Sequence, residues 1–169
     1  MTTVDLDPKF RPSIIADVRW MHFKAGAFDV VLAAPPCQAF SCASMGYHWK
    51  YGPDRSVLEG LEVVRACFRI IREVRPALYV LENPRGKLRK CIGLPTETIY
   101  YCSYGSDHQK PTDLWHNLPE RLRRPCAPHV SSPRWNRDYH DWPDDPSVKA
   151  LWPYKLSLEI CRIAELWIC

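Results

Sequence analysis

The sequence predicts an α/β fold built on a mostly parallel sheet, and three observations support this prediction. Residues 30–34 and 77–81 are short apolar runs, the pattern of strands that are buried on both faces. Between them, apolar side chains recur every three or four positions from residue 57 to residue 71, which predicts an amphipathic helix. Ser56 and Glu59 form a candidate capping box at its start, and Pro76 ends it.

Two shorter strands are predicted upstream, at residues 3–7 and 14–18, and both contain an acidic residue near the end. Asp5 lies in the first of them, and Asp17 lies in the second. An acid at a strand end of a nucleotide-binding sheet often binds ribose hydroxyls. The same acids are suited to cap a strand end or a turn, and the residues alone favour this second interpretation.

The strand at 30–34 leads into the segment around which the chain is organised. Pro35 and Pro36 end the strand because proline has no amide hydrogen for the ladder. Cys37 follows at the carboxyl end of the strand, where open α/β sheets bind ligands. A thiol in this position is a candidate nucleophile, and a buried structural cysteine explains the spacing about equally well.

Two motifs resemble those of the DNA cytosine-5 methyltransferases. Residues 34–41 are similar to the family's Pro-Cys-Gln nucleophile segment, which is followed by Phe-Ser. After the strand at 77–81, Glu82-Asn83-Pro84 is similar to the family's Glu-Asn motif. The resemblance implies a Rossmann-like, S-adenosylmethionine-dependent fold in which Cys37 is the nucleophile and Glu82 grips the target base.

The resemblance also implies binding roles for other residues. Asp5 is expected to bind the ribose of S-adenosylmethionine, Leu6 to pack on its adenine, Asp17 to lie near the adenine amine, and Pro35 to line the cofactor site. In place of the family's Gln-x-Arg-x-Arg segment, the chain has Gln109 with Lys110 and Thr112, and both arginines are absent. The residues expected to contact DNA are Gln38, Ser41, Asn83, Arg85, Lys87, Gln109, Lys110 and Thr112.

The glycine loop that receives the methionine part of the cofactor in this family is absent from the sequence. The chain has seven glycines, and no two of them form a Gly-x-Gly pair. The first, central strand of the sheet is therefore predicted to be missing, which leaves a partial Rossmann-like sheet with open edges. Three explanations fit this absence: a second polypeptide supplies that strand, the strands close up differently, or the sequence is a fragment.

Length and charge distribution indicate one domain that contacts nucleic acid. The 169 residues are expected to form a single methyltransferase-like domain, with cofactor and catalytic strands at 1–84, a basic, proline-rich, DNA-facing region at 85–153 and a C-terminal helix at 154–169. The net charge is +4, and residues 85–137 alone carry 10 basic and 4 acidic side chains. Basic residues interleaved with aromatic ones suit a phosphate backbone and an unstacked base, so DNA is the expected partner.

The cysteines and the hydropathy pattern predict an intracellular protein. Eight scattered cysteines fit reduced thiols better than a disulfide scaffold. No apolar run is long enough to span a bilayer and the N-terminus has no secretory signal, so we expect no membrane contact and a cytoplasmic location in a bacterial, phage or other mobile-element host cell. Cys126 and His129 have the spacing of half a zinc site, with Cys102 and His108 as possible companions, but no full ligand set is present and no metal is expected.

The sequence therefore predicts a DNA (cytosine-5)-methyltransferase domain that transfers a methyl group from S-adenosylmethionine and needs a partner chain or an upstream segment. One alternative is a catalytically inactive relative that binds DNA or a protein partner. A third hypothesis is another thiol-dependent pyrimidine enzyme, although a glutamate matched to the cytosine amine argues against a uracil substrate.

Overall fold

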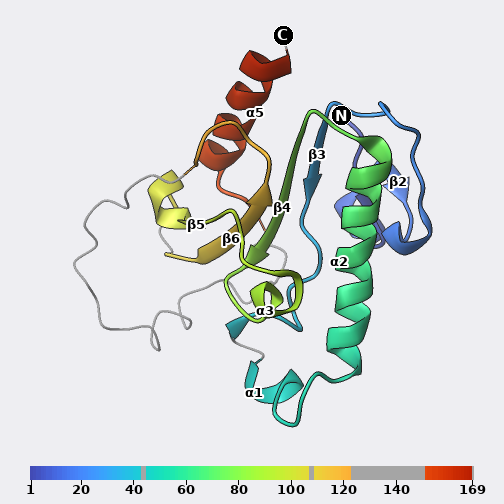
Figure 1. Cartoon of the computed structure of the whole chain (residues 1–169), viewed down its shortest axis with the longest axis vertical. Helices are drawn as coiled ribbons and strands as arrows, with labels where there is room; N and C mark the ends of the chain where they lie inside the picture. The colour runs from blue at the N-terminus through green and yellow to red at the C-terminus, as the bar shows by residue number, and fades with distance from the viewer. Residues whose placement is uncertain (43–44, 107–108, 123–150, 169) are drawn as a thin grey trace.

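A four-stranded sheet between two helices forms the centre of the molecule (Figure 1). The computed structural model describes residues 1–42, 45–106, 109–122 and 151–168. The sheet contains β3 (Val30–Ala33), β4 (Leu78–Pro84), β6 (Pro111–His116) and β5 (Glu97–Tyr100), in that spatial order. The structure thus agrees with the predicted α/β class.

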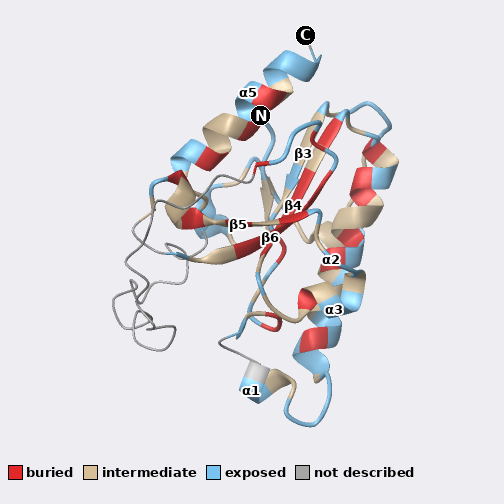
Figure 2. Ribbon diagram, turned by 60° about the vertical axis from the view of Figure 1, so that its left-hand side comes forward, coloured by how far each residue is buried: buried red, intermediate tan, exposed pale blue. Residues whose placement is uncertain are grey.

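The strand directions follow the expected mostly parallel pattern, but the pairings are mixed. β3 and β4 are parallel, with Val30 opposite Leu78, whereas β6 pairs antiparallel with both β4 and β5. Three strands therefore run in one direction, and β6 runs in the opposite direction between β4 and β5. β4 and β6 are the best covered strands, and Figure 2 shows the buried residues of the sheet concentrated on them.

Helix α2 (Arg55–Val74) covers one face of the sheet, as the apolar periodicity predicts. Its N-cap is Asp54, whose carboxylate accepts a hydrogen bond from the Val57 amide at 3.1 Å. The predicted capping box at Ser56 and Glu59 is therefore wrong, and the helix begins two residues earlier. Aspartate accepts from the free amides of the first turn and also favours the positive end of the helix dipole, so it replaces serine in this role.

Helix α5 (Tyr154–Ile168) covers the opposite face of the sheet and agrees with the helix predicted at 154–169. Its buried side chains, Leu156, Ile160 and Ile163, pack with apolar residues of β4, β5 and β6. The α2 face has a second core, to which Phe40 and Leu88 contribute from loops and short helices. The short elements are α1 (Met45–His48), α3 (Leu88–Ile92) and the 3-10 helices η1 (Pro8–Phe10), η2 (Val18–Trp20) and η4 (Tyr101–Tyr104).

The two predicted N-terminal strands form a separate two-stranded sheet. β1 (Val4–Asp5) and β2 (Ile14–Ile15) pair in parallel and are shorter than the sequence predicts. Among the described residues, no strand pairs with the outer edge of β3, where Leu32 is 50% exposed. A parallel strand is normally covered on both sides, so this open edge is an unusual feature of the fold.

Cys102 corrects the expectation that the cysteines are all reduced. It is disulfide-bonded, whereas Cys37, Cys42, Cys67, Cys91 and Cys161 are free thiols. The pairing of a cysteine depends on the folded backbone, which sequence spacing does not reveal. Within the described ranges, no three His, Cys, Asp or Glu side chains gather as a metal site would require, and Cys126, His129 and His108 lie outside those ranges.

In the part of the chain that the structure describes, no helix is both long and apolar enough to cross a membrane.

Candidate active site

Cys37 lies on a tight turn directly after β3, at the position that the sequence predicts. The Cys37 carbonyl accepts hydrogen bonds from the amides of Phe40 and Ser41, both at 2.9 Å. The Phe40 ring is fully buried in the α2-side core, and the Trp49 indole donates to the Ala39 carbonyl at 2.7 Å. The turn is thus fixed from both ends, and it holds a partly buried thiol at the carboxyl edge of the sheet.

A close backbone crossing joins the Cys37 turn to the segment that follows β4. Ser41 and Gly86 form an antiparallel bridge, and the Lys87 amide donates to the Phe40 carbonyl at 2.8 Å. A Cβ atom on Gly86 would lie 2.0 Å from the Phe40 carbonyl oxygen, so this position requires glycine. The crossing fixes the position of the Cys37 turn relative to the end of β4.

Glu82 lies near the carboxyl end of β4 and is only 5% exposed. The Tyr101 hydroxyl donates to Glu82 Oε1 at 3.2 Å, the Lys110 ammonium lies 3.9 Å from the same oxygen, and the Trp152 side chain also hydrogen-bonds the carboxyl group. Burial raises the pKa of Glu82, and Lys110, Tyr101 and Trp152 only partly oppose this effect. The carboxyl group is therefore poised to hold a proton more readily than an exposed glutamate.

The thiol of Cys37 belongs to the same electrostatic cluster. Burial raises the pKa of Cys37, the positive charge of Lys110 opposes this rise, and the negative charge of Glu82 adds to it. Lys110 therefore acts on both acids. Because β3 and β4 are parallel neighbours, their carboxyl ends bring together two residues that are 45 positions apart in the sequence.

Asn83 and Thr112 have structural positions instead of DNA-facing ones. Both are fully buried, and the Asn83 amide donates to the Pro35 carbonyl at 3.1 Å, which joins the ends of β3 and β4. Asn83 alternates with Glu82 along the strand and so points to the other face of the sheet. The structure does not support the predicted DNA contacts for these two residues, because neither is accessible.

The remaining residues predicted to contact DNA lie nearer to the surface. Gln38, Arg85 and Gln109 are exposed, and Ser41 is partly buried. The Lys87 ammonium lies 5.3 Å above the centre of the Trp49 ring. Lys110 differs from them, because its side chain is only 11% exposed beside Glu82.

The residues predicted to hold the cofactor are engaged in local contacts. Asp5 accepts from the Asp7 amide at 2.8 Å, and Asp17 caps η2 while both of its oxygens pair with the Arg19 guanidinium. Leu6 is 65% exposed, and Pro35 is buried. Strand-end and turn capping, the simpler interpretation of the two acids, is thus what the structure contains.

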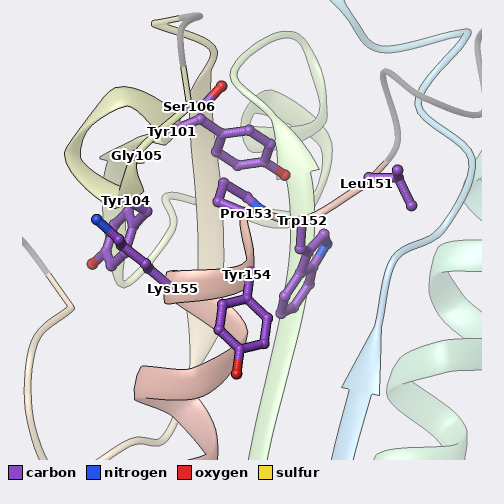
Figure 3. Close-up of a pocket in the computed structure, with 9 residues that line it drawn as sticks. All are labelled: Tyr101, Tyr104, Gly105, Ser106, Leu151, Trp152, Pro153, Tyr154 and Lys155. Carbon is purple, nitrogen blue, oxygen red and sulfur yellow. The ribbon is translucent and has the colours of Figure 1, made fainter.

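An aromatic cavity of about 370 Å³ lies between η4 and the start of α5 (Figure 3). Tyr101, Tyr104, Trp152 and Tyr154 line it, together with Lys155. Figure 3 shows the Tyr101 hydroxyl and the Trp152 ring beside β4. Aromatic faces of this kind stack on nucleobases, and two of them also hold Glu82.

Three residues of this arrangement were not predicted from the sequence: Gly86, Tyr101 and Trp152. A glycine two positions after the Glu82-Asn83-Pro84 motif was a usable signal for a close backbone approach. Tyr101 and Trp152 carry no comparable signal, because their contact with Glu82 depends on how η4 and the segment before α5 pack.

Two sequence comparisons with known proteins point to one family. The sequence model of C-5 cytosine-specific DNA methylases matches residues 8–99, more than half of the chain. A protein named probable DNA (cytosine-5)-methyltransferase from Frog virus 3 (isolate Goorha) is 30% identical over 146 residues, which cover 80% of this chain and 68% of the viral protein. No solved structure matches. The chain therefore belongs to the family of C-5 cytosine-specific DNA methylases.

Proposed function

We propose that this chain provides the cytosine-activating site of a DNA cytosine-5 methyltransferase, with Cys37 as the nucleophile and Glu82 as the group that holds the target base. The observation that best supports this proposal is the cluster at the carboxyl ends of β3 and β4. It combines a thiol, a carboxyl group with a raised pKa and a buried cation, Lys110. A structural cysteine would need neither of the other two groups.

The chemistry requires both acids because carbon 5 of cytosine is a poor nucleophile. When the Cys37 thiolate forms a bond to carbon 6, the electrons of the C5–C6 double bond shift and carbon 5 becomes enamine-like and nucleophilic. A proton that Glu82 holds at ring nitrogen 3 draws electrons away from carbon 6 and favours this addition. Both side chains need direct access to the ring, so the base must leave the DNA duplex.

S-adenosylmethionine supplies the electrophilic methyl group in this family, and the described residues fit only part of it. Asp5 and Leu6 are suited to its ribose and adenine, and Pro35 to the wall of the site. Asp17 is held by Arg19, and the sequence has no Gly-x-Gly run to bring backbone amides to the methionine carboxylate. This partial fit also favours a second candidate function, an inactive relative that binds DNA or a protein partner.

We further propose that an additional strand with a glycine-rich turn pairs with the open edge of β3. The open edge of β3 offers unpaired backbone groups to such a strand, and the exposed Leu6, Ile15 and Leu32 provide apolar surface around it. An upstream part of a longer chain or a second polypeptide would serve equally.

Because the substrate is DNA, we place the protein in the cytoplasm of a bacterial, phage-infected or other mobile-element host cell.

A methyl-transfer assay tests the function and the need for the additional strand together. We expect residues 1–169 alone to show no multiple turnovers with radiolabelled S-adenosylmethionine and mixed-sequence duplex DNA. The same chain, fused to an upstream strand that ends in a Gly-x-Gly turn, is expected to methylate cytosine, because a methyl group misplaced by about 1 Å already loses about 10²-fold in rate.

Each outcome of this assay has a separate meaning. Multiple turnovers by residues 1–169 alone would show that the additional strand is unnecessary. A fused chain that binds S-adenosylmethionine in a titration but methylates no DNA would favour the inactive relative. If the fused strand does not complete the cofactor site, the titration shows no saturable binding of S-adenosylmethionine.

The DNA footprint is proposed to centre on the exposed basic residues after β4. Arg89 is excluded, because its guanidinium pairs with the buried Asp113 carboxylate and with the Thr98 hydroxyl. Arg85, Lys87 and Lys90 remain at the surface, next to the Cys37 turn. These three side chains are placed to bind phosphates on either side of an extruded base.

Replacing Arg85, Lys87 and Lys90 together by alanine should weaken DNA binding and flatten its salt dependence. The slope of log K against log salt is negative, and each phosphate contact that is lost makes it less negative by about 0.9. Fluorescence anisotropy between low and physiological salt measures this slope. The matched control replaces Arg65, Arg72 and Arg162, three exposed arginines on α2 and α5, and should keep the original slope. Equal slopes in both triple variants would place the footprint elsewhere.

A further inference from the structure

Lys110 is a largely buried lysine that takes no part in bond making in the proposed addition of Cys37 to the base. Its side chain is 11% exposed, and its ammonium lies 3.9 Å from Glu82 Oε1 and 3.4 Å from the Tyr101 hydroxyl oxygen. The ammonium also lies 4.5 Å from the centre of the Tyr101 ring. A lysine that binds DNA phosphates would extend into solvent, so this position indicates a function inside the site.

We propose that Lys110 is a positioning residue that balances the charge of the active site, so that a proton can leave the Cys37 thiol while Glu82 delivers one to the base. This inference rests on the proposed function. It differs from the phosphate-binding role that the sequence predicted for Lys110, because its ammonium lies beside the Glu82 carboxyl group and the Tyr101 hydroxyl.

Among the described residues, Lys110 is the cation that acts on both Cys37 and Glu82. Tyr101 faces the two acids as a neutral hydroxyl group, since burial raises its pKa well above the ordinary range. Asp113 has only a weak effect on Glu82 and is itself paired with Arg89. Lys110 and one ionised acid together are neutral, whereas two ionised acids would leave an excess negative charge in a buried site.

This balance allows the addition step to proceed without a net change of charge. In the starting state, Glu82 is ionised beside Lys110 and Cys37 carries its proton. As the S–C6 bond forms, the S–H bond breaks, the thiol proton passes to the Glu82 carboxylate, and Glu82 relays that proton to ring nitrogen 3. Glu82 is therefore ionised before and after the addition, and Lys110 faces one anionic group throughout.

Tyr101 fixes the positions of the Glu82 carboxyl group and the Lys110 ammonium. Its hydroxyl donates to the same Glu82 oxygen that Lys110 approaches, and its ring lies under the ammonium. Both contacts orient one oxygen of the carboxyl group and leave Lys110 little freedom to swing toward solvent. Removing the lysine should therefore change the acidity of Cys37 more than it changes the shape of the site.

Alkylation of Cys37 by iodoacetamide tests this role directly, because only the thiolate reacts. The rate is followed against pH by peptide mass spectrometry on the full chain, with no DNA or cofactor present. We expect Lys110→Met to lower the Cys37 alkylation rate near pH 8 by about three- to tenfold, since loss of a nearby positive charge raises a thiol pKa. Lys110→Arg should restore the wild-type profile.

Two further variants give the experiment its controls. Lys24→Met removes the charge of an exposed lysine outside the proposed site and should leave the Cys37 profile unchanged. Glu82→Gln removes the competing anion and should shift the profile in the opposite direction, toward lower pH. Identical Cys37 profiles for wild type and Lys110→Met would overturn the proposal, and so would a Glu82→Gln profile that moves upward. Because no methyl transfer is measured, either result leaves the proposed function to its own assay.

Discussion

Replacing Cys37 by serine is expected to reduce methyl transfer by at least about 10³-fold in the completed enzyme, with little change in DNA binding. A serine hydroxyl is far less acidic than a thiol, and Lys110 cannot ionise it near neutral pH. The substitution keeps the side-chain shape, so the turn held by Phe40 and Trp49 should persist. Steady-state methyl-transfer kinetics measure the loss.

A trapping experiment identifies the atom that reacts. Duplex DNA that contains 5-fluorocytosine accepts the thiolate and the methyl group, but fluorine does not leave as a proton does, so the covalent adduct persists. We expect this adduct in the wild type and in Cys42→Ser. Cys42 is a suitable control because it is an exposed thiol without a disulfide, five residues after Cys37. Its thiol donates a hydrogen bond to the Arg85 carbonyl. An adduct that forms equally in Cys37→Ser would assign the nucleophile to another residue.

The parts of the fold that the sequence predicted are those that local pattern determines. The apolar runs at 30–34 and 77–81 became β3 and β4, and the helical periodicity between them became α2. Burial on both faces leaves few alternatives to a strand, and a long amphipathic pattern leaves few alternatives to a helix. Because parallel neighbours end at the same edge, the meeting of Cys37 with Glu82 followed from these elements.

The parts that the sequence did not predict depend on packing between distant segments. Lys110 was assigned to DNA because it stands in the segment that resembles the family's Gln-x-Arg-x-Arg motif, and only the fold of β6 against β4 brings it beside Glu82. Asn83 was assigned to DNA for its place in a motif, although its amide bonds the Pro35 carbonyl. The cap moved from Ser56 to Asp54 because both residue types suit that position and only the backbone selects one.

The division of the strands into two sheets has a physical cause in the length of the N-terminal strands. β1 and β2 contain two residues each, too few to provide a stable edge for β3 by themselves. They are held instead through η2, where the Arg69 guanidinium donates to the carbonyls of Val18 and Arg19 at 3.2 Å. In the described part of the chain, the edge of β3 thus stays open because β1 and β2 are short and pair only with each other.

Glu82→Gln is expected to lose about 2–4 kcal/mol of transition-state stabilisation, which lowers kcat/KM by about 30- to 1,000-fold. Glutamine keeps the size of the side chain and can still accept from Tyr101, but it cannot deliver a proton to ring nitrogen 3. The measurement compares wild type and variant in the methyl-transfer assay. Wild-type turnover in Glu82→Gln would exclude Glu82 from the proton transfer.

Glu82→Gln should lower activity but raise the stability of the fold at neutral pH. A carboxylate with a purely structural role would instead lose stability on this substitution. Burial raises the folded-state pKa of Glu82 above its ordinary value of 4.5. Its contribution to stability is therefore complete below that pH and is lost as pH rises through the folded-state pKa. Glu82→Gln removes this loss, so the variant should unfold at a higher denaturant concentration than wild type at neutral pH and at a similar one at pH 4.

Glu97 is the matched control, because it is equally buried and its pKa shifts the other way. Burial alone would raise the pKa of Glu97, but the His116 side chain and the Leu122 amide hold it below its ordinary value. His116 Nδ1 accepts from the Leu118 amide, so His116 Nε2 carries the proton that Glu97 accepts. The stability that Glu97 provides is present above its unfolded-state pKa and is lost as pH falls through the lower folded-state value, so Glu97→Gln should destabilise the fold at neutral pH. If both variants destabilise the fold equally at neutral pH, Glu82 is a structural carboxylate and not one held ready for a proton.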